Sequence, residues 1–218
     1  MRKLVIFGGS GIGMIAASIA ADLGYYTVMG FLNDVVEVGT TIGRYLKYPV
    51  IGKTDDYRRL LDDMDTDFFI AYVGMQSEQT VFERIVSFDI PLQRYATLIH
   101  PTAFVPKGMC DIGMGVLMAP LAQLSPDTAV AHNCILLANC MVGHDSVLER
   151  FAHVATNAVV GANVRVGKAV HVGSNATIRE KVNVGDFSLI GSGSVVLNDV
   201  LPNSIVVGNP AKVLRVKE

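Results

Sequence analysis

The sequence predicts two structural units, a small α/β domain over residues 1–97 and a parallel β-helix over residues 98–218. Two patterns carry this prediction. Residues 1–95 alternate strand-like and helix-like segments, which is typical of a small parallel sheet with helices on its faces. Residues 112–200 repeat with a period of six, which matches neither the period of a helix nor the alternation of a simple strand.

The six-residue repeat runs without a break from Ile112 to Val196. Each of these fifteen positions holds an aliphatic residue or Met, and the residue four positions later is always small or Val. Short strands joined by tight corners explain this pattern, because the large side chains fill the inside of a three-sided prism and the small ones fit near its corners. Three faces make a coil of eighteen residues, so about five coils are expected.

The N-terminal unit is expected to be a Rossmann-like domain with a parallel sheet. We predict strands at 3–7, 26–32, 67–73 and 92–95, and helices at 14–23, 54–64 and 77–88. Their order is β-α-β-α-β-α-β, so the carboxyl ends of the strands meet at one rim, where such sheets bind ligands. The domain is too short for a two-half dinucleotide fold, which favours a mononucleotide or a nucleotide-sugar over NAD.

Residues at that rim are candidates for binding a nucleotide-sugar. A glycine-rich turn after the first strand places backbone N–H groups at the start of a helix, where phosphate binds well. The rim candidates are Ser10, Gly11, Ile12, Asn33, Asp34 and Gly74. A plain tight turn explains the glycines equally well, and turn-capping explains Asn33 and Asp34.

Histidines of the repeat are the candidates for chemistry. Asp145 follows His144, and a carboxylate beside an imidazole can fix its tautomer and raise its basicity. A surface histidine beside a surface aspartate is the alternative. His153 and His171 are one coil apart and are expected to point outward at or near a corner. His144 and His153 are half a coil apart, on opposed sides of the prism, so they can meet only between copies; a homotrimer suits a three-sided prism.

Composition excludes several classes of function. The net charge of −2 leaves no basic surface for nucleic acid. We find no signal peptide and no run of eighteen apolar residues, so no membrane span is expected. Three cysteines without a C-x-x-C pattern indicate a reducing, cytoplasmic environment.

The sequence resembles hexapeptide-repeat acyltransferases in three features. These are the hexads, the run His144-Asp145-Ser146 with His153 nine residues after His144, and the ending Val207-Gly208-Asn209-Pro210-Ala211-Lys212. Within these acyltransferases, the chain is similar along its whole length to the nucleotide-sugar N-acetyltransferases of the bacillosamine pathway and the related sialic acid O-acetyltransferases. The resemblance implies a left-handed β-helix that uses acetyl-CoA. It implies acetylation of a nucleotide-linked amino sugar for glycan or glycoprotein synthesis, by direct transfer in a ternary complex.

The resemblance also implies roles for individual residues. His144 would be the general base, and Asp145 would increase its basicity. His153 would bind the thioester region of acetyl-CoA, and Ala162, Ser174 and Ser192 would contact the coenzyme. One position departs from the family pattern, which has histidine where this chain has Ile12, so a polar contact to the sugar nucleotide is lost.

Three alternatives remain at this point. A sugar O-acetyltransferase of the sialic acid type would use the same residues. A metal-dependent β-helix enzyme of the γ-carbonic anhydrase kind needs closely spaced histidines, and the gaps of twelve, nine and eighteen residues here do not fit, so no metal is expected. The third is a non-catalytic assembly module, because many solenoids only bind partners.

Overall fold

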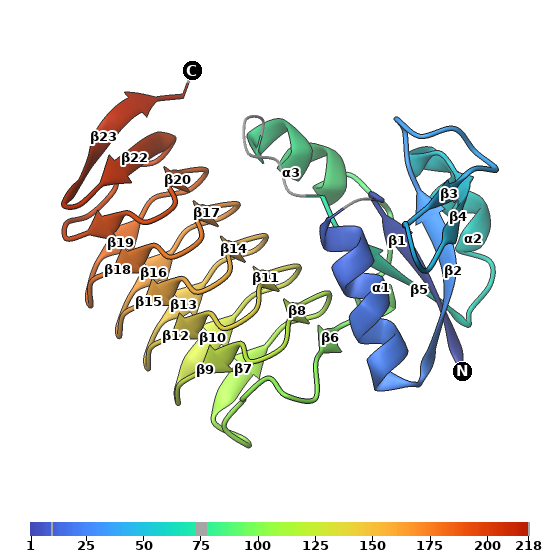
Figure 1. Cartoon of the computed structure of the whole chain (residues 1–218), viewed down its shortest axis with the longest axis horizontal. Helices are drawn as coiled ribbons and strands as arrows, with labels where there is room; N and C mark the ends of the chain where they lie inside the picture. Colours follow the sequence, from blue (N-terminus) through green and yellow to red (C-terminus); the bar gives the residue numbers. More distant parts are fainter. Residues whose placement is uncertain (10, 73–77, 218) are drawn as a thin grey trace.

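The computed structural model describes residues 1–9, 11–72 and 78–217. An α/β domain at the N-terminal end packs against one side of a β-helix, and the chain ends at the far end of the β-helix (Figure 1). The rim residues Ser10 and Gly74 lie outside the described residues.

The α/β domain is built on a five-stranded sheet with the order β3-β4-β2-β1-β5. Its strands are β1 (Arg2–Phe7), β2 (Tyr26–Leu32), β3 (Thr41–Ile42), β4 (Tyr48–Gly52) and β5 (Thr66–Ile70). β1 is parallel to both β2 and β5, and β4 is parallel to β2, which confirms the predicted parallel sheet. β4 and the short antiparallel edge strand β3 were not predicted.

The helices of this domain are α1 (Ile12–Leu23), α2 (Tyr57–Leu60) and α3 (Glu78–Val86), with 3-10 turns η1 (Thr54–Asp56) and η2 (Leu92–Arg94). The predicted helix at 54–64 is therefore shorter than expected and begins as a 3-10 turn.

The predicted strand at 92–95 is wrong. Residues Leu92–Arg94 form the turn η2, and only Tyr95 makes a β-bridge, to Phe68. The turn carries the guanidinium of Arg94, which is 5% exposed, to the carbonyl oxygens of Thr66 and Asp63 at 2.7 Å. These hydrogen bonds to distant carbonyl groups stabilise the turn more than the local sequence favours a strand.

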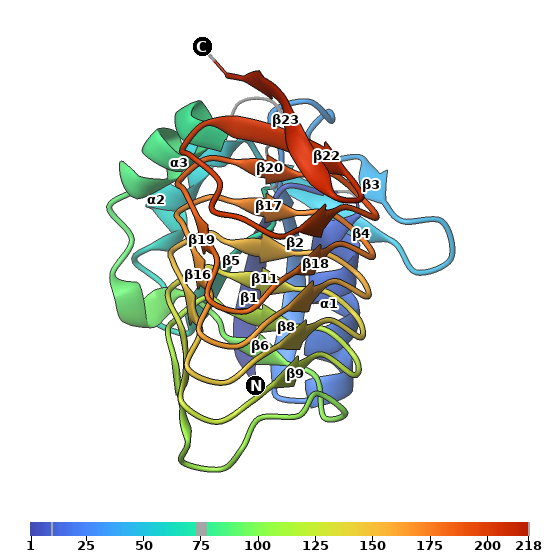
Figure 2. The same ribbon diagram turned by 90° about the vertical axis from the view of Figure 1, so that its left-hand side faces the viewer.

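The β-helix has three faces of parallel strands stacked one coil above another. Face 1 consists of β6 (Leu98–Ile99), β8 (Leu117–Met118), β11 (Ile135–Leu136), β14 (His153–Val154), β17 (His171–Val172), β20 (Leu189–Ile190), β22 (Ser204–Gly208) and β23 (Ala211–Val216). Face 2 consists of β7 (Cys110–Ile112), β10 (Thr128–Val130), β13 (Val147–Leu148), β16 (Arg165–Val166) and β19 (Asn183–Val184). Face 3 consists of β9 (Gln123–Leu124), β12 (Met141–Val142), β15 (Val159–Val160), β18 (Thr177–Ile178) and β21 (Val195–Val196). Figure 2 shows the stacked coils and the antiparallel hairpin of β22 and β23 at their C-terminal end.

Inside the prism, the hexad side chains form one continuous apolar core from Val116 to Val206. Cys134 and Cys140 occupy the small position of their hexads and are buried in this core, and burial raises the pKa of each thiol to about 12. At the corners the backbone has positive φ, and eight of the thirteen described non-glycine residues with this conformation are Asn or Asp. These residues tolerate the left-handed conformation better than other non-glycine residues.

The α/β domain covers face 1. Ala16, Ile19 and Ala20 of α1 share a buried cluster with Leu117 and Ile135 of face 1. At the corner between faces 2 and 1, α3 inserts the ring of Phe82 between two phenylalanine rings of the β-helix (centroid distances 5.4 and 5.6 Å). The two domains therefore meet through packed side chains along α1 and α3 (Figure 1).

Candidate active site

A pocket of about 520 Å³ lies at the carboxyl ends of β1, β2 and β5. Its lining includes Gly8, Gly9, Gly11, Ile12, Asn33, Asp34, Tyr72 and Arg84. An added Cβ at Gly9 would meet the ends of the Ile42 and Asn33 side chains, so both would have to move to admit a larger residue. The structure thus brings together the four described rim candidates (Gly11, Ile12, Asn33 and Asp34) in one pocket.

Asn33 and Asp34 are both held in place at this pocket. Asn33 Oδ1 accepts hydrogen bonds from the backbone N–H groups of Val35 and Val36 at 2.8 Å. Asp34 accepts one from the Thr54 N–H and pairs with Arg84, each at 2.8 Å. Burial raises the pKa of Asp34, but the bonds from Thr54 and Arg84 outweigh it and lower the pKa overall. The pocket therefore contains a fixed carboxylate and a cation.

A second, smaller cavity of about 30 Å³ lies between α3 and the β-helix, enough space for one water molecule. Tyr72 lines both this cavity and the larger pocket, so the two are neighbours. Phe82, Phe151 and Ala169 line its apolar side. His153 and His171 line its polar side.

His153 is almost fully enclosed, with 7% of its surface exposed. The expectation that it points outward at or near a corner is right in direction, but His153 lies on strand β14 and the α/β domain covers it. Its Nδ1 is 2.9 Å from Nδ1 of His171, and its Nε2 has no hydrogen-bond partner among the described residues. Burial, with repulsion from His171, lowers the pKa of His153 to about 3, so this imidazole is neutral at pH 7.

His144 and Asp145 lie at the corner between faces 3 and 2, and both side chains are more than half exposed. His144 Nδ1 is 2.6 Å from Asp145 Oδ2. A carboxylate can only accept, so Nδ1 donates the proton and Nε2 is left with a free lone pair, as a general base requires. Ser146, the next residue, is fully buried and its hydroxyl donates to the Gly161 carbonyl at 2.9 Å, which removes it as a nucleophile.

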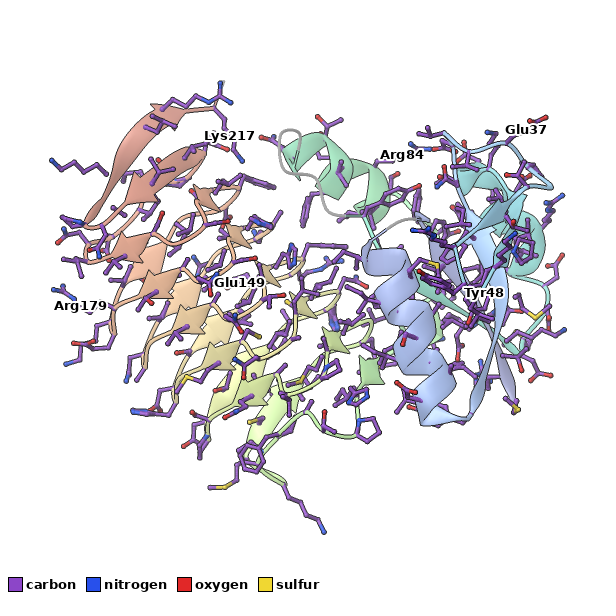
Figure 3. The ribbon with its side chains drawn as sticks, in the orientation of Figure 1. Glu37, Tyr48, Arg84, Glu149, Arg179 and Lys217 are labelled. Carbon is purple, nitrogen blue, oxygen red and sulfur yellow. The ribbon has the colours of Figure 1, made fainter. Side chains whose placement is uncertain are left out.

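Within one copy, His144 and His153 are on opposite sides of the prism. His144 stands at the corner that lies across from face 1, and His153 is on face 1. Arg179, in the same corner two coils further on, projects away from the α/β domain in Figure 3. A single chain therefore does not bring these two imidazoles together.

The predicted coenzyme contacts are divided between two corners. Ala162 is one coil above His144, and its neighbour Asn163 donates its N–H to the His144 carbonyl. Ser174 and Ser192 are stacked at the corner between faces 1 and 3, where the Gly193 N–H donates to the Ser174 carbonyl. The predicted coenzyme contacts are therefore at two different edges of one prism.

Comparisons with known proteins agree with this architecture. Residues 3–85 match the family description of the PglD N-terminal domain. The acetyltransferase domain of PglB from Neisseria gonorrhoeae FA1090, solved in complex with acetyl coenzyme A, is 30% identical, with a TM-score of 0.81 over 98% of this chain and 99% of that chain. The chain belongs to this acetyltransferase family. The match confirms the predicted resemblance and the left-handed β-helix.

Two more distant structures share the fold. A mutant of perosamine N-acetyltransferase from Caulobacter crescentus, in complex with CoA and GDP-perosamine, is 21% identical with a TM-score of 0.83 over 99% of this chain and 98% of that chain. WeeI from Acinetobacter baumannii AYE is 20% identical with a TM-score of 0.72 over 98% of this chain and 100% of that chain. Both keep the order of an α/β domain followed by a β-helix that this acetyltransferase has.

The described part of the acetyltransferase offers no group of three or more His, Cys, Asp or Glu side chains that could hold a metal ion. None of its described helices is both long enough and apolar enough to cross a bilayer.

Sequence reasoning did not find Arg84, Tyr72 or Phe82 as parts of the acetyltransferase site. Arg84 pairs with a carboxylate fifty residues away, and it leaves the end of α3 that is nearest the sheet (Figure 3). Tyr72 sits just beyond β5 and bonds Thr54 at 2.6 Å. A basic or aromatic residue on a predicted helix, or at the end of a predicted strand, gives no local signal, so only the folded chain identifies these three.

Proposed function

We propose that the protein transfers the acetyl group of acetyl-CoA to the amino group of a nucleotide-linked amino sugar. The observation that carries the proposal is the hydrogen-bonded His144–Asp145 pair, in a chain that matches, over 98% of its length, an acetyltransferase domain solved with acetyl coenzyme A. The pocket at the strand ends supports the choice of acceptor, because it offers a glycine-rich turn for a diphosphate together with polar groups for a base or a ribose.

His144 acts as the general base in this proposal. Its Nε2 takes a proton from the amine while the amine nitrogen attacks the thioester carbon. The C–S bond then breaks, and His144 passes the proton to the departing thiolate. The burial of Ser146, the residue next to this pair, supports direct transfer within a ternary complex over an acyl-enzyme.

In this proposal His153 would bind the thioester oxygen; its place in the lining of the small cavity and an Nε2 with no partner among the described residues support this role. Ala162, Ser174 and Ser192 would contact the coenzyme through backbone groups in a groove between two copies. Since His144 and His153 are on opposed sides of one prism, the protein acts as a closed oligomer, and we propose a homotrimer. The three unpaired cysteines support a cytoplasmic reaction.

The nucleotide-sugar would occupy the strand-end pocket, against Gly11, Asn33 and Asp34. Ser10 and Gly74 stay predicted contacts, because they lie outside the described residues. Ile12 replaces the family histidine in this lining. Its apolar side chain cannot donate a hydrogen bond to the sugar or phosphate, so this position favours an acceptor with an apolar group there, such as a deoxy carbon.

The test is a panel of acceptors offered to the purified protein with acetyl-CoA, with release of the CoA thiol measured. UDP-, GDP- and dTDP-linked 4-amino sugars are compared with their hydroxyl counterparts. His144→Ala should lower kcat by about 10²–10⁴-fold, the usual contribution of a general base. His132→Ala is the matched control, because His132 has the same place in its hexad but is followed by Asn133.

A rate near that of the unsubstituted protein in His144→Ala would contradict the mechanism. Acetylation of the hydroxyl sugars alone would contradict the choice of an amine acceptor.

A further inference from the structure

His153 and His171 form a directly hydrogen-bonded pair of imidazoles. They are in register on β14 and β17, one coil apart, with ring centroids at 4.5 Å and ring planes at 75°. Both atoms of the contact are Nδ1, at 2.9 Å. A hydrogen bond between two such nitrogens contains one proton, so the ring that donates it decides the tautomer of the other ring.

The pair interrupts an otherwise aliphatic column on face 1. The outward positions in register with His153 and His171 on the other coils are Leu117, Ile135 and Leu189. Two imidazoles beneath the α/β domain are costly there, because buried polar groups lose their hydration. Packing alone therefore does not account for them.

Nε2 of His153 is the atom of the pair that is left to bind a ligand. It is buried, no described residue satisfies it, and His153 lines the small cavity. A thioester oxygen, and still more the oxyanion that forms from it, can bind only to a donor. Nε2 must therefore carry a proton, and because this imidazole is neutral, Nδ1 must then be an acceptor.

Building on the proposed function, we infer that His171 is a positioning residue that donates its Nδ1 proton to His153 and so keeps the other proton of His153 on Nε2, ready for the thioester oxygen. The bond from His153 Nε2 strengthens as the oxyanion develops, so His171 should affect kcat much more than the KM for acetyl-CoA.

An isosteric pair of substitutions separates this role from simple packing. In His171→Asn the side-chain amide NH₂ can replace the Nδ1–H donor, so kcat should stay within about threefold of the unsubstituted value. In His171→Asp a carboxylate of the same size can only accept, which draws the proton of His153 to Nδ1. Its kcat should fall by about 10²-fold, as for the loss of one oxyanion donor, with little change in KM.

Nitrogen-15 NMR of the imidazole side chains reads the tautomer without any assay. The His153 signals are assigned as those lost in His153→Asn. The proton should be on Nε2 in the unsubstituted protein and in His171→Asn, and on Nδ1 in His171→Asp.

A proton on His153 Nδ1 in the unsubstituted protein would overturn the inference, as would equal kcat values for the Asn and Asp variants. If no acceptor sugar is acetylated, the proposed function fails, and the NMR tautomer alone still decides the role of His171.

Discussion

Asp145 stands at a corner of the β-helix where the backbone has φ 57°, and its carboxylate accepts the Nδ1 proton of His144. The same residue type therefore meets two demands. Asp and Asn both tolerate the left-handed corner, but only Asp supplies a negative charge beside the imidazole. The hexad pattern explains why the chain can place a carboxylate next to a histidine here without distorting the coil.

Asp145→Asn should lower kcat by about 10²-fold, because the amide has no charge to stabilise the imidazolium and can hold the ring in the wrong tautomer. The corner itself should survive, since Asn163 has the same conformation one coil above (φ 56°). Steady-state kinetics and thermal unfolding measure the two effects separately. Asp127→Asn, the same corner one coil below at φ 59°, is the control and should leave both unchanged. Equal kcat values for the two variants would contradict a role for the Asp145 charge.

His153 shows which properties of a single residue could be predicted from the sequence and which could not. The eighteen-residue spacing correctly placed it next to His171, because the coil length follows directly from the hexads. Its burial could not be predicted, because Phe82 and Tyr72, which share its cavity, come from an α/β domain more than seventy residues earlier. Whether His153 contacts the coenzyme stays a prediction.

At the scale of elements, α3 links the two cavities. Arg84 of α3 pairs with Asp34 at the strand-end pocket, while Phe82 lies between Phe151 and Phe187 on the β-helix. These two phenylalanines are at positive-φ corners, and the small Ala169 between them leaves room for the ring of Phe82. A bulky residue at a left-handed corner is unfavourable by itself, so the contact with α3 offsets that cost.

Phe82→Ala should loosen α3. It removes two edge-to-face aromatic contacts at about 0.5–1.5 kcal/mol each, so amide hydrogen exchange within α3 should become roughly 10- to 100-fold faster. Val86→Ala is the control on the same helix, because Val86 is 44% exposed and its loss should matter little. Hydrogen-exchange mass spectrometry of both variants makes the comparison. Equal exchange in the two variants would show that the aromatic contact does not hold α3.

Elements of the two domains were not equally predictable. Each strand of the β-helix follows from its own hexad, since the inward aliphatic and the small residue recur within six positions. In the α/β domain, β1 and β2 were read correctly from apolar runs, but β4 and η2 were not. β4 contains Pro49, which is atypical of strands, and η2 forms because Arg94 reaches carbonyl groups about thirty residues away.

At the scale of the whole molecule, the width of the prism decides whether one chain can complete the proposed site. Six residues of extended chain span up to roughly 20 Å per face, so a corner and the face across from it are too far apart for one substrate to touch both. The α/β domain is packed on face 1 through α1, which keeps the strand-end pocket on the same side as His153. In the proposed mechanism the general base is missing on that side, and the exposed His144 of a neighbouring copy would supply it.

Two inactive variants should therefore restore activity when they assemble in one trimer. Each site needs His144 from one copy and His153 from the next, so His144→Ala and His153→Ala should both be nearly inactive alone. A trimer that contains both variants, in either 2:1 ratio, has three interfaces, and in one of them the intact His144 of one copy meets the intact His153 of the next, so about one third of the unsubstituted activity should return. Co-expression of differently tagged chains, followed by purification through both tags and light scattering, gives mixed trimers of known composition. Mixing the purified homotrimers without subunit exchange is the control and should give no gain. If co-expressed chains also give no gain, or if a single chain proves fully active, both histidines of a site must come from the same copy. A movement that this fold does not suggest would then have to bring the opposed sides of the prism together.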